Sequence, residues 1–277
     1  MDLKNFLPPI ATDFIRKNQK IVKYKSYEEA LSHCTSNAYQ NEELCHIIAD
    51  KTLIHNESLK KPFTFNPTTV YLAFALNYFA NASGKRSITV LDFGGACGAH
   101  YYEVRNIIPQ TISLKWIVVE TEQMIRSAAS RELAKGELHF MARIEDITDA
   151  VDFVHSSSTL QYVPAPFDFL KKLIDVKAKM ILLNRMMFNK NNDDIITVQR
   201  SFLSSNGPGK LPQGYTDRPV KYPHTTMSND KMNSIMIDEG YELFSEFNEP
   251  SGKVSLGRED ILAKGLLFVE KDFLTIT

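Results

Sequence analysis

The sequence has few cysteines, almost no net charge and no long apolar run. Its three cysteines, Cys34, Cys45 and Cys97, lack metal-ligand spacing, so we expect reduced cytosolic thiols. The net charge of −1 gives no reason to expect nucleic acid as a partner. No window approaches about 20 consecutive apolar residues, which predicts no membrane span. The opening MDLKNFLPPI has no apolar run behind a basic flank, so we expect no signal peptide and a cytoplasmic protein.

Two sequence motifs are also missing. None of the seven histidines has the HExxH spacing of a zinc site, so we expect no metal. A dinucleotide fingerprint requires G-x-G-x-x-G, because the pyrophosphate rests on exposed backbone N–H groups. Gly95 and Gly98 fit its second and third positions, but Phe93 stands where the first glycine is required. This argues against an NAD enzyme.

Residues 1–85 are predicted to form an N-terminal helical cap. Helices are expected from Ser26, from Glu42 to about His55 and from Asn66-Pro67. From Ser87 short apolar strands alternate with helices, which is typical of an α/β fold with a mostly parallel sheet and helices on both faces. The predicted strands are 87–93, 114–120, 138–142, 153–157 and 179–183, and the predicted helices are 99–108, 122–135 and 166–176.

The alternation stops after Asn184. A β-prone run covers 195–199, and 204–222 is rich in Gly, Pro and Ser and is expected to be a long loop. A helix is expected after Ser228, a strand after Gly240 and a last strand at 265–270. We therefore predict a second unit over 86–277, with a lid-like loop at 200–225.

The most informative stretch is VLDFGGACG, residues 90–98, where a predicted strand meets a glycine turn and a helix. Open α/β sheets bind adenosine-type cofactors at such a junction. Asp92, Gly94, Ala96 and Gly98 fit Asp-x-Gly-x-(Gly/Ala)-x-Gly. This pattern resembles the first motif of the Rossmann-like S-adenosylmethionine-dependent methyltransferases. The resemblance implies a sheet of about seven strands that binds S-adenosylmethionine, with the acid holding the cofactor's ammonium group directly or through water.

Two further signals agree with this resemblance. Glu120 ends the second predicted strand about 22 residues after Gly98, where an acid accepts hydrogen bonds from a ribose diol. The segment VDFVHSSSTLQYV, residues 151–163, looks like the fourth strand of these enzymes, whose carboxyl end faces the cofactor's methyl group. The cofactor-binding residues predicted in this way are Asp92, Gly94, Gly95, Ala96, Cys97, Gly98, Glu120, Ile144, His155 and Ser156.

The resemblance extends over most of residues 27–270 to a small group of bacterial proteins classed as methyltransferases. Several of these are encoded among genes for surface polysaccharides. The matching segments include Leu160-Gln161-Tyr162, Asn184-Arg185, Thr197-Val198-Gln199 and Tyr222-Pro223. The predicted acceptor-binding residues are Tyr102, Gln161, Tyr162, Arg185, Gln199 and Tyr222.

Three histidines are candidate general bases: His100, His155 and His224. Arg185 is a candidate for binding an acidic or phosphorylated acceptor, or a surface ion pair. The resemblance predicts an S-adenosylmethionine-dependent methyltransferase that O-methylates a sugar, a glycan or another small polar acceptor. A catalytically silent cofactor-binding module and an NAD or nucleotide-sugar enzyme on the same fold stay open as alternatives.

Overall fold

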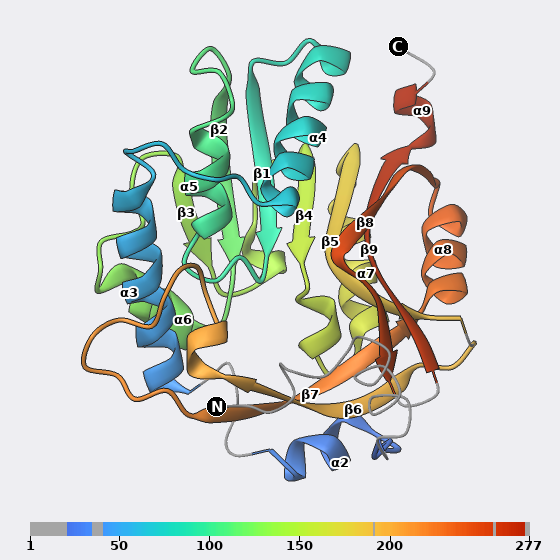
Figure 1. Cartoon of the computed structure of the whole chain (residues 1–277). Helices are drawn as coiled ribbons and strands as arrows, with labels where there is room; N and C mark the ends of the chain where they lie inside the picture. Colours follow the sequence, from blue (N-terminus) through green and yellow to red (C-terminus); the bar gives the residue numbers. More distant parts are fainter. Residues whose placement is uncertain (1–20, 35–40, 191, 257–258, 275–277) are drawn as a thin grey trace.

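A computed structural model describes residues 21–34, 41–190, 192–256 and 259–274 (Figure 1). One large sheet organises the chain. Its strands are β1 (Ser87–Phe93), β2 (Ser113–Val119), β3 (Leu138–Met141), β4 (Phe153–Ser157), β5 (Met180–Asn189), β6 (Ile195–Phe202), β7 (Pro219–Ser228), β8 (Tyr241–Leu256) and β9 (Glu259–Glu270). The five central strands are parallel, in the order β3-β2-β1-β4-β5. Beyond β5 the antiparallel pair β9 and β8 closes one side of the sheet.

Helices cover both faces of this sheet. They are α2 (Tyr27–Ser32), α3 (Glu42–Ser58), α4 (Pro67–Ser83), α5 (Ala99–Arg105), α6 (Glu122–Ala129), α7 (Pro166–Asp175), α8 (Asn229–Asp238) and α9 (Lys271–Leu274). Ser26, Asn66 and Ser228 cap α2, α4 and α8, because each side chain accepts a hydrogen bond from an N–H in the first turn. These helix starts confirm the sequence prediction.

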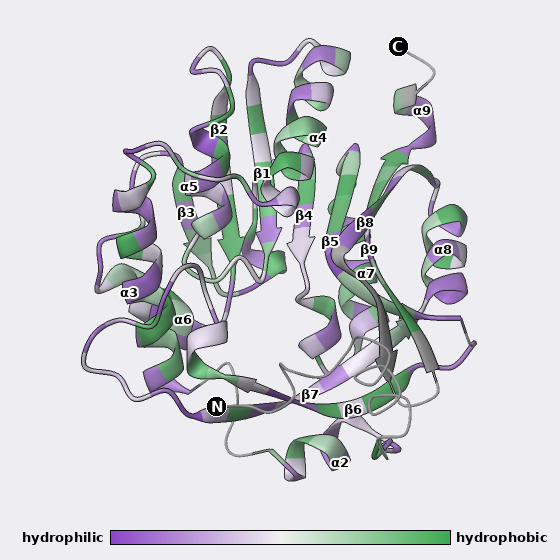
Figure 2. Cartoon of the chain, viewed as in Figure 1, coloured by the Kyte–Doolittle hydropathy of each residue, from purple (hydrophilic) through white to green (hydrophobic). Residues whose placement is uncertain are grey.

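Alternating side chains of the central strands fill two separate cores. Val90 of β1 packs with Leu72 and Phe79 of α4 on one face. Leu91, the next residue, packs with Leu170 of α7 and Met232 of α8 on the other. The central strands are accordingly mostly hydrophobic in Figure 2. The predicted fold class is confirmed, with nine strands in place of about seven, since β6 and β7 form an additional hairpin.

This hairpin crosses the carboxyl edge of the parallel strands, with α2 on its far side (Figure 1). The predicted loop at 204–222 is wrong at its end, because β7 already begins at Pro219, which pairs with Phe202. Proline is tolerated as the first residue of a strand, where it need not donate to the ladder. The short helix η5 (Leu203–Ser205) also lies within that stretch.

Several other boundaries differ from prediction. Helix α6 ends at Ala129 instead of 135, since Glu132 has a φ of +50° and cannot continue a helix. Strand β5 continues to Asn189, because after a bulge near Arg185 it pairs again with β9 and then with β7. Strand β9 is longer than predicted, and α9 was not predicted. Among the described residues no helix has the length and apolarity to cross a bilayer.

A third core joins the segments that cover the carboxyl edge. Ile48 of α3 packs with Cys97 of the glycine turn, Met124 of α6 and Tyr222 of β7. Beside it, Lys51 is 1% exposed, and its ammonium group donates to the carbonyls of Ser204, at 2.8 Å, and Asn206. Helix α3 therefore holds the segment that follows β6. The division of the chain near residue 85 stays a prediction. Helix α4, which precedes this point, shares its core with the sheet.

Replacing Lys51 by methionine is expected to loosen residues 206–218. The apolar stem would be kept, but two carbonyls would lose their donor, which costs about 1–3 kcal/mol of unfolding free energy. Limited proteolysis followed by mass spectrometry would show earlier cleavage in this segment. Lys210→Met is the control, because Lys210 lies exposed in the same segment. Equal cleavage of the two variants would contradict the role given to Lys51.

Candidate functional site

The glycine turn between β1 and α5 depends on backbone conformations that few residues adopt. Gly94 has a φ of +71°, Gly98 of +84° and Ala96 of +50°. A methyl group on Gly94 would overlap the side chain of Thr159, which lies over the turn. Both glycines are thus required for two reasons, the left-handed backbone and close packing. The turn and the segment after β4 are in direct contact.

Gly94 and Gly209 share the left-handed backbone but differ in close packing. Gly209 has a φ of +68°, almost that of Gly94, but a methyl group there would meet nothing within 4 Å. Gly209→Ala is expected to cost about 1 kcal/mol of unfolding free energy through backbone strain alone, and Gly94→Ala about 2–3 kcal/mol. Urea denaturation measures both. Equal losses would show that Thr159 moves away freely and that the close packing is not required.

Asp92 lies at the end of β1, fully buried, with hydrogen-bonding groups around its carboxylate. One oxygen lies 2.8 Å from Nδ1 of His155. The other accepts a hydrogen bond from Nε1 of Trp116 at 3.1 Å and lies 3.4 Å from Nδ1 of His100. Burial alone would raise the pKa of Asp92, but the two histidines outweigh it and hold the pKa far below its usual range. The carboxylate is therefore charged, and its nearest partners belong to the chain itself.

The arrangement around Asp92 concerns two predicted general bases, His100 and His155, and the predicted absence of a metal. His155 is 0% exposed, and burial lowers its pKa despite Asp92, so as placed it does not reach an acceptor. His100 is partly exposed and is the outer member of the group. Asp92, His100 and His155 are also the one set of potential metal ligands found among the described residues, with ligand atoms within 4.8 Å of one another. The prediction that no metal is bound stays a prediction.

Glu120 follows β2 and contacts the glycine turn directly. Its carboxylate accepts hydrogen bonds from the N–H of Ala96 at 3.2 Å and of Thr121 at 2.9 Å. Burial, together with a smaller contribution from the charge of Asp92, raises the pKa of Glu120 to about 7, although the two N–H groups oppose the rise. The acid that the sequence assigned to a ribose thus lies against the turn that the sequence assigned to the same cofactor.

Two of the other predicted cofactor residues, Cys97 and Ser156, lie in the glycine turn and in β4. Cys97 is buried with its sulfur 3.5 Å from that of Met124, and burial raises the pKa of its thiol. Ser156 is buried and donates to the carbonyl of Phe93 at 3.1 Å. Ile144 lies in the short helix η3 (Ile144–Asp146) and packs into the second core. Cys97 and Ser156 therefore have structural partners of their own.

Strained backbone marks the end of β4 and the bulge within β5. Ser158 has a φ of +67° and Arg185 of +52°, although neither is a glycine. Such conformations cost about 1–3 kcal/mol each and persist where the surrounding contacts fix them. Buried polar side chains surround these two residues. Asn184 is fully buried and its Oδ1 has no partner among the described residues, while Glu249 accepts a hydrogen bond from the Arg185 N–H at 2.8 Å.

The predicted acceptor residues only partly converge. Tyr162, in the short helix η4 (Leu160–Tyr162), donates to Gln199 of β6 at 2.7 Å, and its ring lies 5.3 Å from that of His224. Gln161 is 1% exposed and bonds to Ser158 and Met187, so it supports the loop. The ring of Tyr222 lies 6.1 Å from that of Tyr162, but Tyr222 is 2% exposed and its hydroxyl donates to Asn206. Tyr102 lies apart from this group and donates to the carbonyl of Leu133.

Trp116, Thr159, Asn184 and Glu249 lie at this edge but were not among the predicted site residues, although Asn184 belongs to one of the matching segments. Trp116 was visible only as the single tryptophan of the chain. Nothing local marked Glu249, since it contacts Arg185 from 64 positions away. Its role follows from the antiparallel pair β8 and β9 beside β5.

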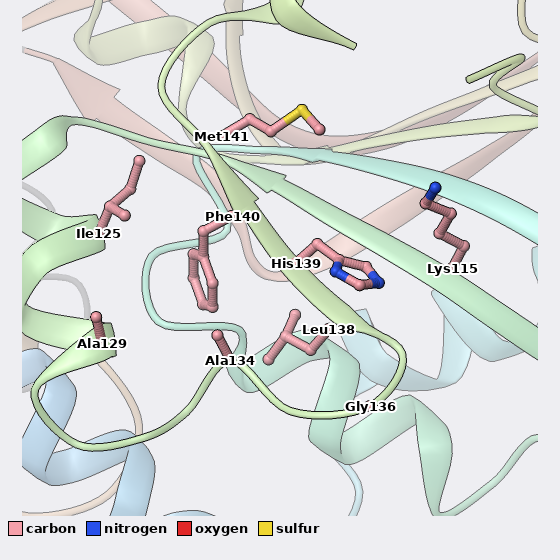
Figure 3. Close-up of a pocket in the computed structure, with 9 residues that line it drawn as sticks. All are labelled: Lys115, Ile125, Ala129, Ala134, Gly136, Leu138, His139, Phe140 and Met141. Carbon is pink, nitrogen blue, oxygen red and sulfur yellow. The ribbon is translucent and has the colours of Figure 1, made fainter. Parts of the chain in front are cut away.

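A hollow of the described structure lies elsewhere, along the outer edge of β3 (Figure 3). It measures about 450 Å³, and none of the candidate residues lines it. Its walls come from β2, β3, α6 and the turn between α6 and β3: Lys115, Ile125, Ala129, Ala134, Gly136, Leu138, His139, Phe140 and Met141. The arranged polar groups, and not this hollow, identify the candidate site.

No protein-family model matches the chain, and no curated protein matches it. Among solved structures it is similar to the CcbJ methyltransferase from Streptomyces caelestis, with 10% identity and a TM-score of 0.49, over 85% of this chain and 99% of that one. It is also similar to an S-adenosylmethionine-dependent methyltransferase from Clostridium acetobutylicum, with 12% identity and a TM-score of 0.44, over 71% and 89%. A third is the amino pentose methyltransferase CalS10 from Micromonospora echinaspora, with 11% identity and a TM-score of 0.44, over 75% and 92%. Similarity at this level concerns the path of the chain.

Proposed function

We propose that the chain is an S-adenosylmethionine-dependent methyltransferase. The observation that carries the proposal is the contact between Glu120 and Ala96, which joins the acid after β2 to the glycine turn after β1. A ribose diol held by that acid would lie beside a turn whose small residues allow close approach. Phe93 at the first glycine position of a dinucleotide fingerprint supports this cofactor over NAD.

The residues around the carboxyl edge would mainly align and desolvate the acceptor. The cofactor supplies a methyl carbon already activated by its sulfonium. The residues of the chain would hold the acceptor atom in line with that carbon, and the acceptor's proton would leave to a base or to water. Asp92, buried among Trp116 and two histidines, would act by fixing His100 and His155. Asp92 would hold the cofactor's ammonium group only by accepting a further hydrogen bond beside its contacts with Trp116 and the two histidines.

His224 is a base candidate for O-methylation of a hydroxyl acceptor. The residue is 9% exposed, and no hydrogen bond to its ring is found among the described residues. Burial lowers the pKa of His224 to about 4, so the ring is neutral at pH 7 and can accept a proton. Tyr162 and Gln199 beside it offer polar atoms to a sugar. That the acceptor is a sugar or glycan rests on the resemblance to the bacterial methyltransferase group.

Calorimetry with S-adenosylhomocysteine, with NAD as the comparison, tests the proposal. We expect binding of the first, no binding of the second, and weaker binding of the first to Glu120→Ala. Preference for NAD would favour the alternative of a nucleotide-dependent enzyme. Incubation with a labelled methyl donor and a panel of sugars then separates an active transferase from a catalytically silent module.

A further inference from the structure

Arg185 is held from three sides at the bulge within β5. Its N–H donates to the buried carboxylate of Glu249 at 2.8 Å, and its Nε donates to the hydroxyl of Ser157 at 2.8 Å. Its carbonyl accepts a hydrogen bond from Gln161 at 3.3 Å. Ser157, Gln161 and Glu249 are themselves 5%, 1% and 4% exposed. The backbone and the root of the guanidinium group are therefore fixed by buried groups.

The outer end of the same side chain makes no hydrogen bond to the described residues. Arg185 is exposed, and its two terminal nitrogens have no partner among the described residues. A guanidinium group whose Nε is already bonded still presents a planar pair of donors, which matches the two oxygens of a carboxylate or phosphate. The left-handed backbone of Arg185, at a φ of +52°, is the strain expected where a side chain is aimed for function.

The charge around this group favours a single negative charge on its ligand. The side chains bonded to Arg185 are those of Ser157 and Gln161, which carry no charge, and of Glu249, which bonds to the backbone N–H of Arg185. No hydrogen bond or ion pair among the described residues joins a second cation to Ser157, Gln161 or Glu249. One arginine near one carboxylate leaves little excess positive charge, which suits a monoanion better than a phosphate dianion.

We propose that Arg185 binds a carboxylate of the methyl acceptor, which would make the acceptor an acidic sugar or a similar small acid. The description of this ligand as the acceptor rests on the proposed function. The carboxylate site itself does not, because it depends only on Arg185, Ser157 and Glu249.

Nitrogen-15 NMR of the Arg185 Nε–H, assigned by its loss in Arg185→Lys, tests this directly. Galacturonate, galactose and galactose 1-phosphate would be titrated into the protein at constant ionic strength. We expect a saturable shift with galacturonate in the millimolar range and at least tenfold weaker binding of galactose. A tighter response to galactose 1-phosphate, or no saturable response to any of the three, would overturn the proposal.

Variants supply a second readout by calorimetry with galacturonate. Arg185→Gln is expected to lose at least tenfold in affinity, whereas Arg200→Gln, an exposed arginine of the hairpin, should bind as the wild type does. Equal affinity of the two variants would overturn the proposal. S-adenosylhomocysteine affinity, measured on the same proteins, keeps the two proposals apart. If it is absent while galacturonate binds, the proposed function fails and the carboxylate site stands.

Discussion

Replacing Asp92 by alanine is expected to lower the free energy of unfolding by about 3–5 kcal/mol, the largest effect of any substitution considered. The change leaves Nε1 of Trp116 and Nδ1 of His155 buried without their partner. It also opens a small cavity at the end of β1. Urea denaturation at pH 7 measures the loss, and Asp92→Asn should lose less because one amide oxygen can still accept.

His100→Ala is the matched control, because His100 contacts the same carboxylate from a partly exposed position at 3.4 Å. It should cost below about 1 kcal/mol, as expected for a single weak contact at the surface. If the two substitutions cost the same, the buried pair of Asp92 and His155 would not be the source of stability. S-adenosylhomocysteine affinity of Asp92→Asn shows in addition whether this acid also touches the cofactor.

The second large effect concerns pH and Glu120. S-adenosylhomocysteine is expected to bind about tenfold more weakly at pH 6 than at pH 8, since Glu120 has a pKa of about 7 and only its ionised form accepts from both ribose hydroxyls. Because binding favours the ionised form of Glu120, the affinity for S-adenosylhomocysteine is full well above pH 7 and falls as the pH drops through 7. Glu120→Ala should weaken binding about 10- to 100-fold at pH 8. Calorimetry at three pH values measures both.

Glu120→Gln is the sharper variant, because it keeps one acceptor and cannot ionise. Its affinity should be nearly constant between pH 6 and pH 8. Glu122→Gln serves as the control, since Glu122 is an exposed acid two residues further on and should leave the pH dependence intact. Persistence of the full pH dependence in Glu120→Gln would assign it to another group and remove the support that Glu120 gives to the proposed cofactor.

The sequence predicted most of the central sheet because the signals there are local. Strands β1 and β4 have the predicted bounds, and the caps Ser26, Asn66 and Ser228 were identified from residue type and position. The ends of elements beyond Asn184 were less accurate. There the chain forms antiparallel pairs, and the extent of β7 and β9 depends on partners far away in the sequence.

The glycine turn and the acid after β2 could be inferred from residue type and spacing alone. A left-handed φ and close packing require glycine at Gly94 and Gly98, so the backbone conformation can be inferred from residue type. The contacts of Asp92 and Arg185, by contrast, depend on the tertiary structure. Asp92 meets His155 from 63 positions away, and Arg185 meets Glu249 from 64. Such contacts follow from strand order and register, which bring distant residues to one edge, and the residues alone carry no local sign of them.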